Sequence, residues 1–198
     1  NGPGPVRQRL SCRVGTAIAS SMRLGTECPL YNDGEEAGLE KKDYWSRILK
    51  YDLATKENTA QYAYPLDAVA QKPKKEGGFM VNGISSILAL NEIELLVMER
   101  SFSTGYENDL QVKIYLADLR NATDIKGDSS LVLKPALNPV KKKLLFNFST
   151  LKMRIDNLEG ISFGPRLKNG NRSLLVISDN NFNPLEITQL ILLDSGMK

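Results

Sequence analysis

The sequence of 198 residues contains no histidine and only two cysteines. Without histidine, the chain has no Ser-His-Asp or Cys-His nucleophile, no histidine phosphatase chemistry and no histidine-ligated zinc. Two cysteines are also too few for a four-thiolate zinc site. Any metal bound within this chain must therefore be held by oxygen ligands, which favour calcium or magnesium over transition metals.

The sequence also lacks long apolar runs and a strong charge of either sign. No run approaches the roughly 18 apolar residues that a membrane span needs, and the start of the chain lacks the apolar middle region of a secretory signal. The net charge is +3, and the lysines are scattered apart from short runs at 72–75 and 141–143. Such runs are typical of solvated loops and strand edges, so we expect neither a transmembrane segment nor a nucleic-acid partner.

The two cysteines and the glycosylation sequons bear on the compartment. Cys12 and Cys28 suit one disulfide in an exported protein, and they suit two unrelated thiols equally well. Three N-glycosylation sequons begin at Asn121, Asn147 and Asn171, and they are usable only in a secretory compartment. We therefore expect a secreted or otherwise exported glycoprotein.

The chain is rich in short apolar runs of five to eight residues, which are enriched in Ile, Leu, Val, Tyr and Phe and are too short for typical helices. Residues 47–53 and 59–66 predict a hairpin with Tyr62 and Tyr64 on one face. This pattern predicts an all-β fold. The further strands are predicted in "GISSILAL", "IELLVMERS", "VKIYLADL", "KKLLFNFS", "EGISFGP", "SLLVISD" and "TQLILLD".

Three of these apolar motifs occur twice, at an offset of 76 to 79 residues. Each copy predicts three or four antiparallel strands, which is typical of a β-propeller blade, with a β-sandwich as the alternative. The repeated motifs are "GIS" at 83–85 and 160–162, "LLV" at 95–97 and 174–176, and "IYLAD" at 114–118, echoed by "LILLD" at 190–194.

The number of predicted blades is small. Residues 83–150 form one four-stranded unit, residues 155–195 form a unit without its last strand, and residues around 22–66 supply the latter part of another. A closed propeller uses four to eight blades, so about three leave an open edge. We therefore expect a partial propeller of about three blades that either self-associates or belongs with missing N-terminal blades.

The stretches "DNLEGISFGPRL" and "SLLVISDNNFNPLEITQLILL", together with several earlier ones, resemble the C-terminal half of the phytase-like domain, also called the esterase-like activity of phytase family. The similarity runs from about Glu27 to Asp194 and divides the chain into a poorly matched segment, 1–26, and a part of a phytase-like propeller domain, 27–198. Its most specific part is "NLEGISFGP" followed by "SDNNFNP". The other stretches are "YDLATKENTAQYAYPLD", "NGISSILAL", "LLVMERSF", "IYLADLRNATDI" and "LLFNFSTL".

Acidic and amide residues stand at the ends of the predicted strands. In a propeller, such residues from different blades converge on the central channel, where carboxylates repel one another unless a cation compensates them. Calcium suits this arrangement because it takes six to eight oxygen ligands. The resemblance implies the same ligands, which are Glu99, Glu159 and Asp179 as first choices, followed by Glu27, Asn157 and Asn180.

Two functions are consistent with this pattern. In the first, the chain hydrolyses a small-molecule ester or phosphoester: calcium polarises the scissile group, Glu159 or Asp179 acts as base, and Arg100 and Arg166 bind phosphate oxygens. In the second, the chain is a non-catalytic propeller that binds a ligand or a protein around a structural calcium. Asp179 to Asn181 also suit an ordinary turn, and Glu99 with Arg100 also suit a solvated pair.

Overall fold

The computed structural model describes residues 12–18, 20–106 and 109–198. The described chain is all-β, as predicted: it contains three antiparallel sheets, none of them closed, and its only helices are two short 3-10 turns at Tyr31–Asp33 (η1) and Phe148–Leu151 (η2). The described part contains no helix that is long and apolar enough to cross a membrane. The pairing considered for Cys12 and Cys28 involves a side chain outside the described residues.

The strands follow the chain order within each sheet. Sheet I contains β1 (Cys12–Ile18), β2 (Ser21–Thr26), β3 (Tyr44–Asp52) and β4 (Asn58–Leu66). Sheet II contains β5 (Met80–Ala89), β6 (Glu94–Ser103), β7 (Leu110–Asp118) and β8 (Lys141–Asn147). Sheet III contains β9 (Leu158–Arg166), β10 (Arg172–Ser178) and β11 (Leu190–Asp194).

The predicted strands are confirmed, including the hairpin, which is formed by β3 and β4. The repeated motifs lie on corresponding strands, because β5, β6 and β7 of sheet II correspond to β9, β10 and β11 of sheet III. Sheet I begins earlier than the unit predicted from about residue 22, since β1 pairs with β2 and completes a four-stranded sheet.

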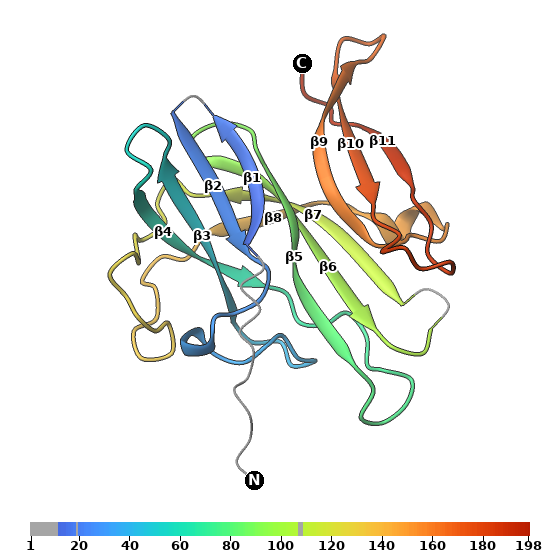
Figure 1. The fold of residues 1–198 in the computed structure, drawn as a ribbon, viewed down its shortest axis with the longest axis horizontal. Helices are drawn as coiled ribbons and strands as arrows, with labels where there is room; N and C mark the ends of the chain where they lie inside the picture. Colours follow the sequence, from blue (N-terminus) through green and yellow to red (C-terminus); the bar gives the residue numbers. More distant parts are fainter. Residues whose placement is uncertain (1–11, 19, 107–108) are drawn as a thin grey trace.

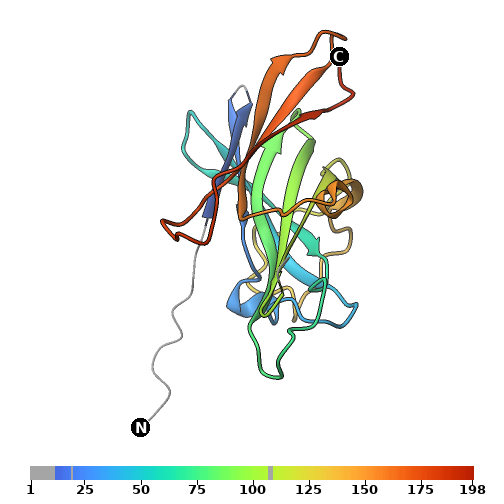
Figure 2. The same cartoon turned by 90° about the vertical axis from the view of Figure 1, so that its right-hand side faces the viewer.

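Sheet II lies between the other two sheets (Figure 1). The side chains of its strand β6 accordingly pack on both of its neighbours. Alternate side chains of a strand point to opposite faces: Leu95 and Val97 join the core shared with sheet I, whereas Leu96 and Met98 join the core shared with sheet III. Burial on both faces explains the unbroken apolar run "LLVM". Sheet III extends past the other two sheets at the end where the C-terminus lies (Figure 2).

The connection between β7 and β8 covers the outer edge of sheet I. Ile125 and Leu131 from this connection pack on Ala63 of β4. The backbone N–H groups of Ile125 and Val140 donate to the carbonyl oxygens of Gln61 and Ala63, at 2.8 Å and 2.9 Å. The edge of β4 is therefore not left open to another chain.

Candidate active site

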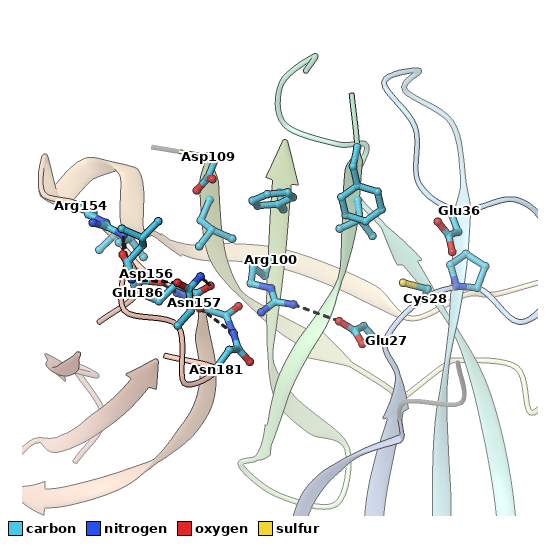
Figure 3. Close-up of a pocket in the computed structure, with 18 of the residues that line it drawn as sticks. Glu27, Cys28, Glu36, Arg100, Asp109, Arg154, Asp156, Asn157, Asn181 and Glu186 are labelled. Carbon is cyan, nitrogen blue, oxygen red and sulfur yellow. Dashed lines mark hydrogen bonds and ion pairs between the residues drawn. The ribbon is translucent and has the colours of Figure 1, made fainter. Parts of the chain in front are cut away.

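A cavity of about 890 Å³ lies where the three sheets meet (Figure 3). Its lining comes from the segment after β2, from β5, β6 and the start of β7, and from the segments before β9 and after β10. Phe79, Phe102 and Leu185 are among its apolar residues. Its charged and amide residues are Glu27, Glu36, Arg100, Asp109, Arg154, Asp156, Asn157, Asn181, Asn183 and Glu186.

Arg100 of β6 joins residues from the other two sheets. Its guanidinium group forms ion pairs with Glu159 of β9 at 2.7 Å and with Glu27, just after β2, at 3.4 Å. The Asn157 side chain donates to the same oxygen of Glu159 at 3.0 Å. Figure 3 shows Arg100 between Glu27 on one side and the group around Asn157 on the other. We call Glu27, Arg100, Asn157 and Glu159 the Arg100 cluster.

Local packing fixes the segment that carries Glu27. The backbone N–H of Ile84 donates to the Glu27 carbonyl oxygen at 2.9 Å. Glycine is required at position 83, because a Cβ there would lie 2.7 Å from that same oxygen. Farther along the segment, the buried carboxylate of Asp33 accepts two hydrogen bonds from Arg47, at 2.6 Å and 2.7 Å. These contacts hold one wall of the cavity against sheets I and II.

The opposite wall is held by two further carboxylates. Asp156 is 2% exposed, and one of its oxygens accepts from Arg154 at 3.1 Å and from the backbone N–H of Ile187 at 3.0 Å. Glu186 accepts from the side chains of Asn181 and Asn183, both at 2.9 Å. The segments before β9 and after β10 are therefore tied to each other, and they form a single wall.

Asp109, just before β7, carries a perturbed carboxyl group. Burial raises its pKa above the usual value, and the negative charges of Asp156 and Glu186 raise it further, while Arg154 partly opposes them. A carboxyl group that keeps its proton to higher pH can serve as a proton donor. The sequence alone did not single out Asp109, Arg154 or Glu186, because they lie in connecting segments without a periodic pattern.

Glu99 lies on the other face of β6 from Arg100, at the interface of sheets I and II. It is 2% exposed, and it accepts hydrogen bonds from four groups of the protein. Because neighbouring residues of a strand point to opposite faces, Glu99 and Glu159 are not brought together. The four donors are the Tyr64 hydroxyl at 2.8 Å, the Asp67 backbone N–H at 3.0 Å, the Asn82 amide at 2.8 Å and the Lys142 ammonium at 2.5 Å.

The remaining predicted site residues lie around sheet III. Asp179 follows β10, and its backbone N–H donates to the Asn157 carbonyl at 3.0 Å, so the start of β9 and the end of β10 do share one edge. Its exposed side chain accepts from the Asn181 N–H, as in a turn. The Asn180 side chain accepts from the Phe182 N–H in the same turn. Arg166 lies at the far end of β9 and donates to the Gly170 carbonyl at 2.9 Å.

Among the described residues, no three or more Asp, Glu or Cys side chains are grouped so that they could hold a metal ion. In the Arg100 cluster, the guanidinium group itself is the cation that lies between two carboxylates. The described donor set therefore does not have the arrangement expected for a calcium site.

Comparison with known proteins identifies the family. The family model described as phytase-like, esterase-like activity of phytase, matches residues 16–182. No curated protein and no solved structure shows significant similarity to the chain. The match covers most of the chain, including the Arg100 cluster and most of the cavity lining. The chain belongs to the phytase-like family, esterase-like activity of phytase.

Proposed function

We propose that the cavity binds a small-molecule ester and that the chain hydrolyses it. The observation that carries this proposal is the position of Arg100 in the wall of the cavity, where its guanidinium group pairs with Glu27 of the lining and with Glu159 of the adjoining strand β9. The lining also contains Asp109, a separate carboxyl group whose pKa is raised by burial. Membership of the phytase-like family, whose description includes esterase-like activity, supports the same reaction class.

Each residue of the site has a role in this reaction. Arg100 donates to the carbonyl or phosphoryl oxygen and stabilises the negative charge that develops on it. Glu159 takes a proton from water while the water oxygen bonds to the acyl carbon or phosphorus. The bond to the leaving oxygen then breaks, and Asp109 donates the proton that this oxygen needs. Asp179 is our second choice for the base, because its backbone bonds to Asn157 beside Glu159.

The charge of the lining favours an uncharged ester over a polyphosphorylated one. Among the described lining residues, five carboxylates stand against two arginines, Arg100 and Arg154. Such a surplus of negative charge repels a polyanion. The aromatic rings of Phe79 and Phe102 instead offer an apolar surface for an acyl or alkyl group.

A direct test measures hydrolysis of an uncharged nitrophenyl ester and of nitrophenyl phosphate, each with a chelator and with added calcium. We expect the wild-type chain to cleave the uncharged ester with the chelator present, and Arg100→Met to lower kcat at least ~100-fold. Arg166→Met is the matched control and should retain activity. Cleavage of the phosphate alone, and only with calcium, would instead support the calcium-dependent phosphoesterase predicted from the sequence.

A non-catalytic binding module is the second candidate function. It is favoured by the ion pairs that both terminal nitrogens of the Arg100 guanidinium group form with carboxylates. Arg100 must give up one of these carboxylates before it can bind and polarise a substrate oxygen. Calorimetry distinguishes the two functions: ester binding that Arg100→Met abolishes, without turnover of any ester, supports the binding module and contradicts the hydrolase.

We further propose that the three sheets are consecutive blades of a β-propeller. The first strands of the sheets lie next to one another, since β5 contacts both β1 and β9. The motif repeat relates β5–β7 to β9–β11 strand by strand. Both features suit blades arranged around one axis. An experimental structure in which the three sheets pack as in a sandwich would contradict this assignment.

A further inference from the structure

One face of β6 is covered by sheet III along part of its length and lines the cavity along the rest. Leu96, Met98, Arg100 and Phe102 share this face, because alternate residues of a strand point to the same side. Leu96 and Met98 are at most 1% exposed in the core shared with sheet III, whereas Arg100 and Phe102 line the cavity. Arg100 therefore lies where the packed core ends and the cavity begins.

Three apolar side chains lie side by side on the floor of the cavity, two positions beyond Arg100 along β6. Phe102 of β6 pairs with Val81 of β5 and with Leu110 of β7, so the three side chains share one face of sheet II. All three line the cavity. Phe79, just before β5, extends them, since its ring centre lies 6.0 Å from that of Phe102. We call Phe79, Val81, Phe102 and Leu110 the apolar row.

The position of Asp109 indicates how an ester would meet the apolar row. Asp109 directly precedes Leu110, and its carbonyl oxygen accepts from the backbone N–H of Ser103, the last residue of β6, at 3.0 Å. Figure 3 shows Asp109 near that end of β6 and Arg100 farther back. In the reaction proposed above, Arg100 binds the carbonyl oxygen and Asp109 protonates the leaving oxygen. The bond that breaks must then point from Arg100 towards the apolar row.

We propose that the apolar row binds the alcohol half of the ester, so that the substrates are esters of apolar alcohols. This assignment rests on the proposed hydrolase function. The carbon chain of the alcohol runs from the leaving oxygen past Leu110 and over the ring of Phe102, where it is removed from water. In the reaction, the hydroxyl group of the water bonds to the acyl carbon while Glu159 takes its other proton. The bond from the acyl carbon to the leaving oxygen breaks, and the alcohol departs with the proton from Asp109.

The acyl half of the ester meets different surroundings. Arg100 is flanked by Glu27 on one side and by Glu159, with its donor Asn157, on the other. Behind Arg100 along β6, Met98 is fully buried in the core. A carbon chain that extends from the acyl carbon in these directions would contact charged groups or the packed core, and it would gain no apolar surface. The acyl group should therefore be short, and the alcohol should determine specificity.

Hydrolysis of two series of esters by the purified chain tests this assignment, with the acid released at constant pH as the readout. The alcohol series contains acetate esters from methyl to hexyl acetate, and the acyl series contains methyl esters from acetate to hexanoate. We expect kcat/KM to rise roughly threefold to fourfold with each methylene added to the alcohol, because each one contacts the apolar row. With each methylene added to the acyl group, kcat/KM should stay level or fall.

Phe102→Ser and Phe79→Ser are the variants that test the apolar row. Each should lower the kcat/KM of hexyl acetate, relative to that of methyl acetate, at least ~10-fold. Phe79 is 60% exposed, so Phe79→Ser removes little internal packing and serves as the test if Phe102→Ser does not fold. The control is Leu133→Ser, which removes an apolar side chain that is 87% exposed in the β7–β8 connection. This control should keep the wild-type rise along the alcohol series.

The results separate the assignment from the hydrolase function on which it rests. An acyl series that rises as steeply as the alcohol series, or an alcohol series that both phenylalanine variants leave unchanged, would overturn the assignment and leave the hydrolase in place. If no ester is hydrolysed, the proposed function fails, and calorimetry with hexan-1-ol tests the apolar row by itself. Tighter binding of hexan-1-ol by the wild-type chain than by the two phenylalanine variants would support an apolar-alcohol site, and equal binding would overturn it.

Discussion

Glu99 and Arg100 are neighbours on β6, yet they belong to two different kinds of charged site. Glu99 faces the interface of sheets I and II, where it bonds to Lys142, whose ammonium group also pairs with Asp67 at 2.7 Å. The same ammonium lies 4.3 Å from the centre of the Tyr115 ring. We call Asp67, Glu99, Tyr115 and Lys142, with the donors to Glu99, the Glu99 network.

The difference between the two sites lies in the space beside them. The Glu99 network borders a void of about 10 Å³, which is no larger than one water molecule needs. The Arg100 cluster opens on a cavity of about 890 Å³. In the Glu99 network, the charged groups are enclosed by one another and stabilise the contact between sheets I and II. In the Arg100 cluster, similar residues lie beside a cavity, where a charged group can exchange a protein partner for a substrate. Substitutions should therefore affect stability at the first site and function at the second.

The largest effect on stability is expected from Lys142→Met. Removing the ammonium group leaves Glu99 buried and Asp67 half-buried without their shared cation, and breaking such a buried pair costs about 3–5 kcal/mol. Urea denaturation measures the loss. Lys141→Met and Lys143→Met are matched controls on exposed positions of β8 and should change stability by less than about 0.5 kcal/mol. Equal effects at all three lysines would contradict the structural role of the Glu99 network.

A smaller effect, and one that depends on pH, is expected from Asp67→Asn. Burial raises the pKa of Asp67, but hydrogen bonds from Lys142, Tyr115 and Lys113 outweigh it and lower the pKa to about 2. Because the folded-state pKa is depressed, the ionised carboxylate stabilises the fold above pH ~4, and this contribution is lost as pH falls towards 2.

Asp67→Asn should therefore lower the free energy of unfolding at pH 7 by about 2 kcal/mol and flatten its decline between pH 4 and pH 2. Unfolding by urea at four pH values from 2 to 7 measures both effects. Asp43→Asn, at an exposed position before β3, is the control and should keep the wild-type decline. An unchanged acid profile in Asp67→Asn would show that the Glu99 network does not control acid stability.

The sequence predicted the strands and the repeat well, because period-two apolar patterns and β-branched residues are local signals. It also placed Glu27, Asn157 and Glu159 in one candidate site, and the structure brings them together around Arg100. It did not separate Glu99 from this group. The run "LLVM" before Glu99 is apolar at both parities, so the pattern of β6 does not reveal which face borders the cavity.

Other parts of the site depend on contacts that no local pattern encodes. Arg154 and Leu185 lie 31 positions apart in connecting segments, and the Arg154 side chain donates to the Leu185 carbonyl at 2.7 Å only because β9 and β10 pair at the same edge. The Asp33–Arg47 pair likewise forms only once the segment after β2 folds back on β3. Such contacts follow from the packing of whole sheets, which the sequence alone did not specify.

The smallest effect on stability, and the one of opposite sign, is expected from Asp109→Asn. The pKa of Asp109 is raised in the folded state, so above this pKa its negative charge near Asp156 and Glu186 opposes folding. An amide has no such penalty, so Asp109→Asn should increase the free energy of unfolding at pH 7, where the carboxyl group of the unfolded chain is ionised, by less than about 1 kcal/mol. At pH 3, where the carboxyl group is largely protonated in both states, the difference should vanish.

The same substitution should lower esterase activity, because an amide cannot supply the proton that the leaving oxygen needs. Asp67→Asn also replaces a carboxylate by an amide, but it should lower the free energy of unfolding. The two variants should therefore change the free energy of unfolding at pH 7 in opposite directions. Urea denaturation together with ester hydrolysis measures the pair. Greater stability with lower activity in Asp109→Asn is the pattern of a residue kept for function at a cost in stability, whereas a loss of stability at pH 7 would place Asp109 with the structural carboxylates.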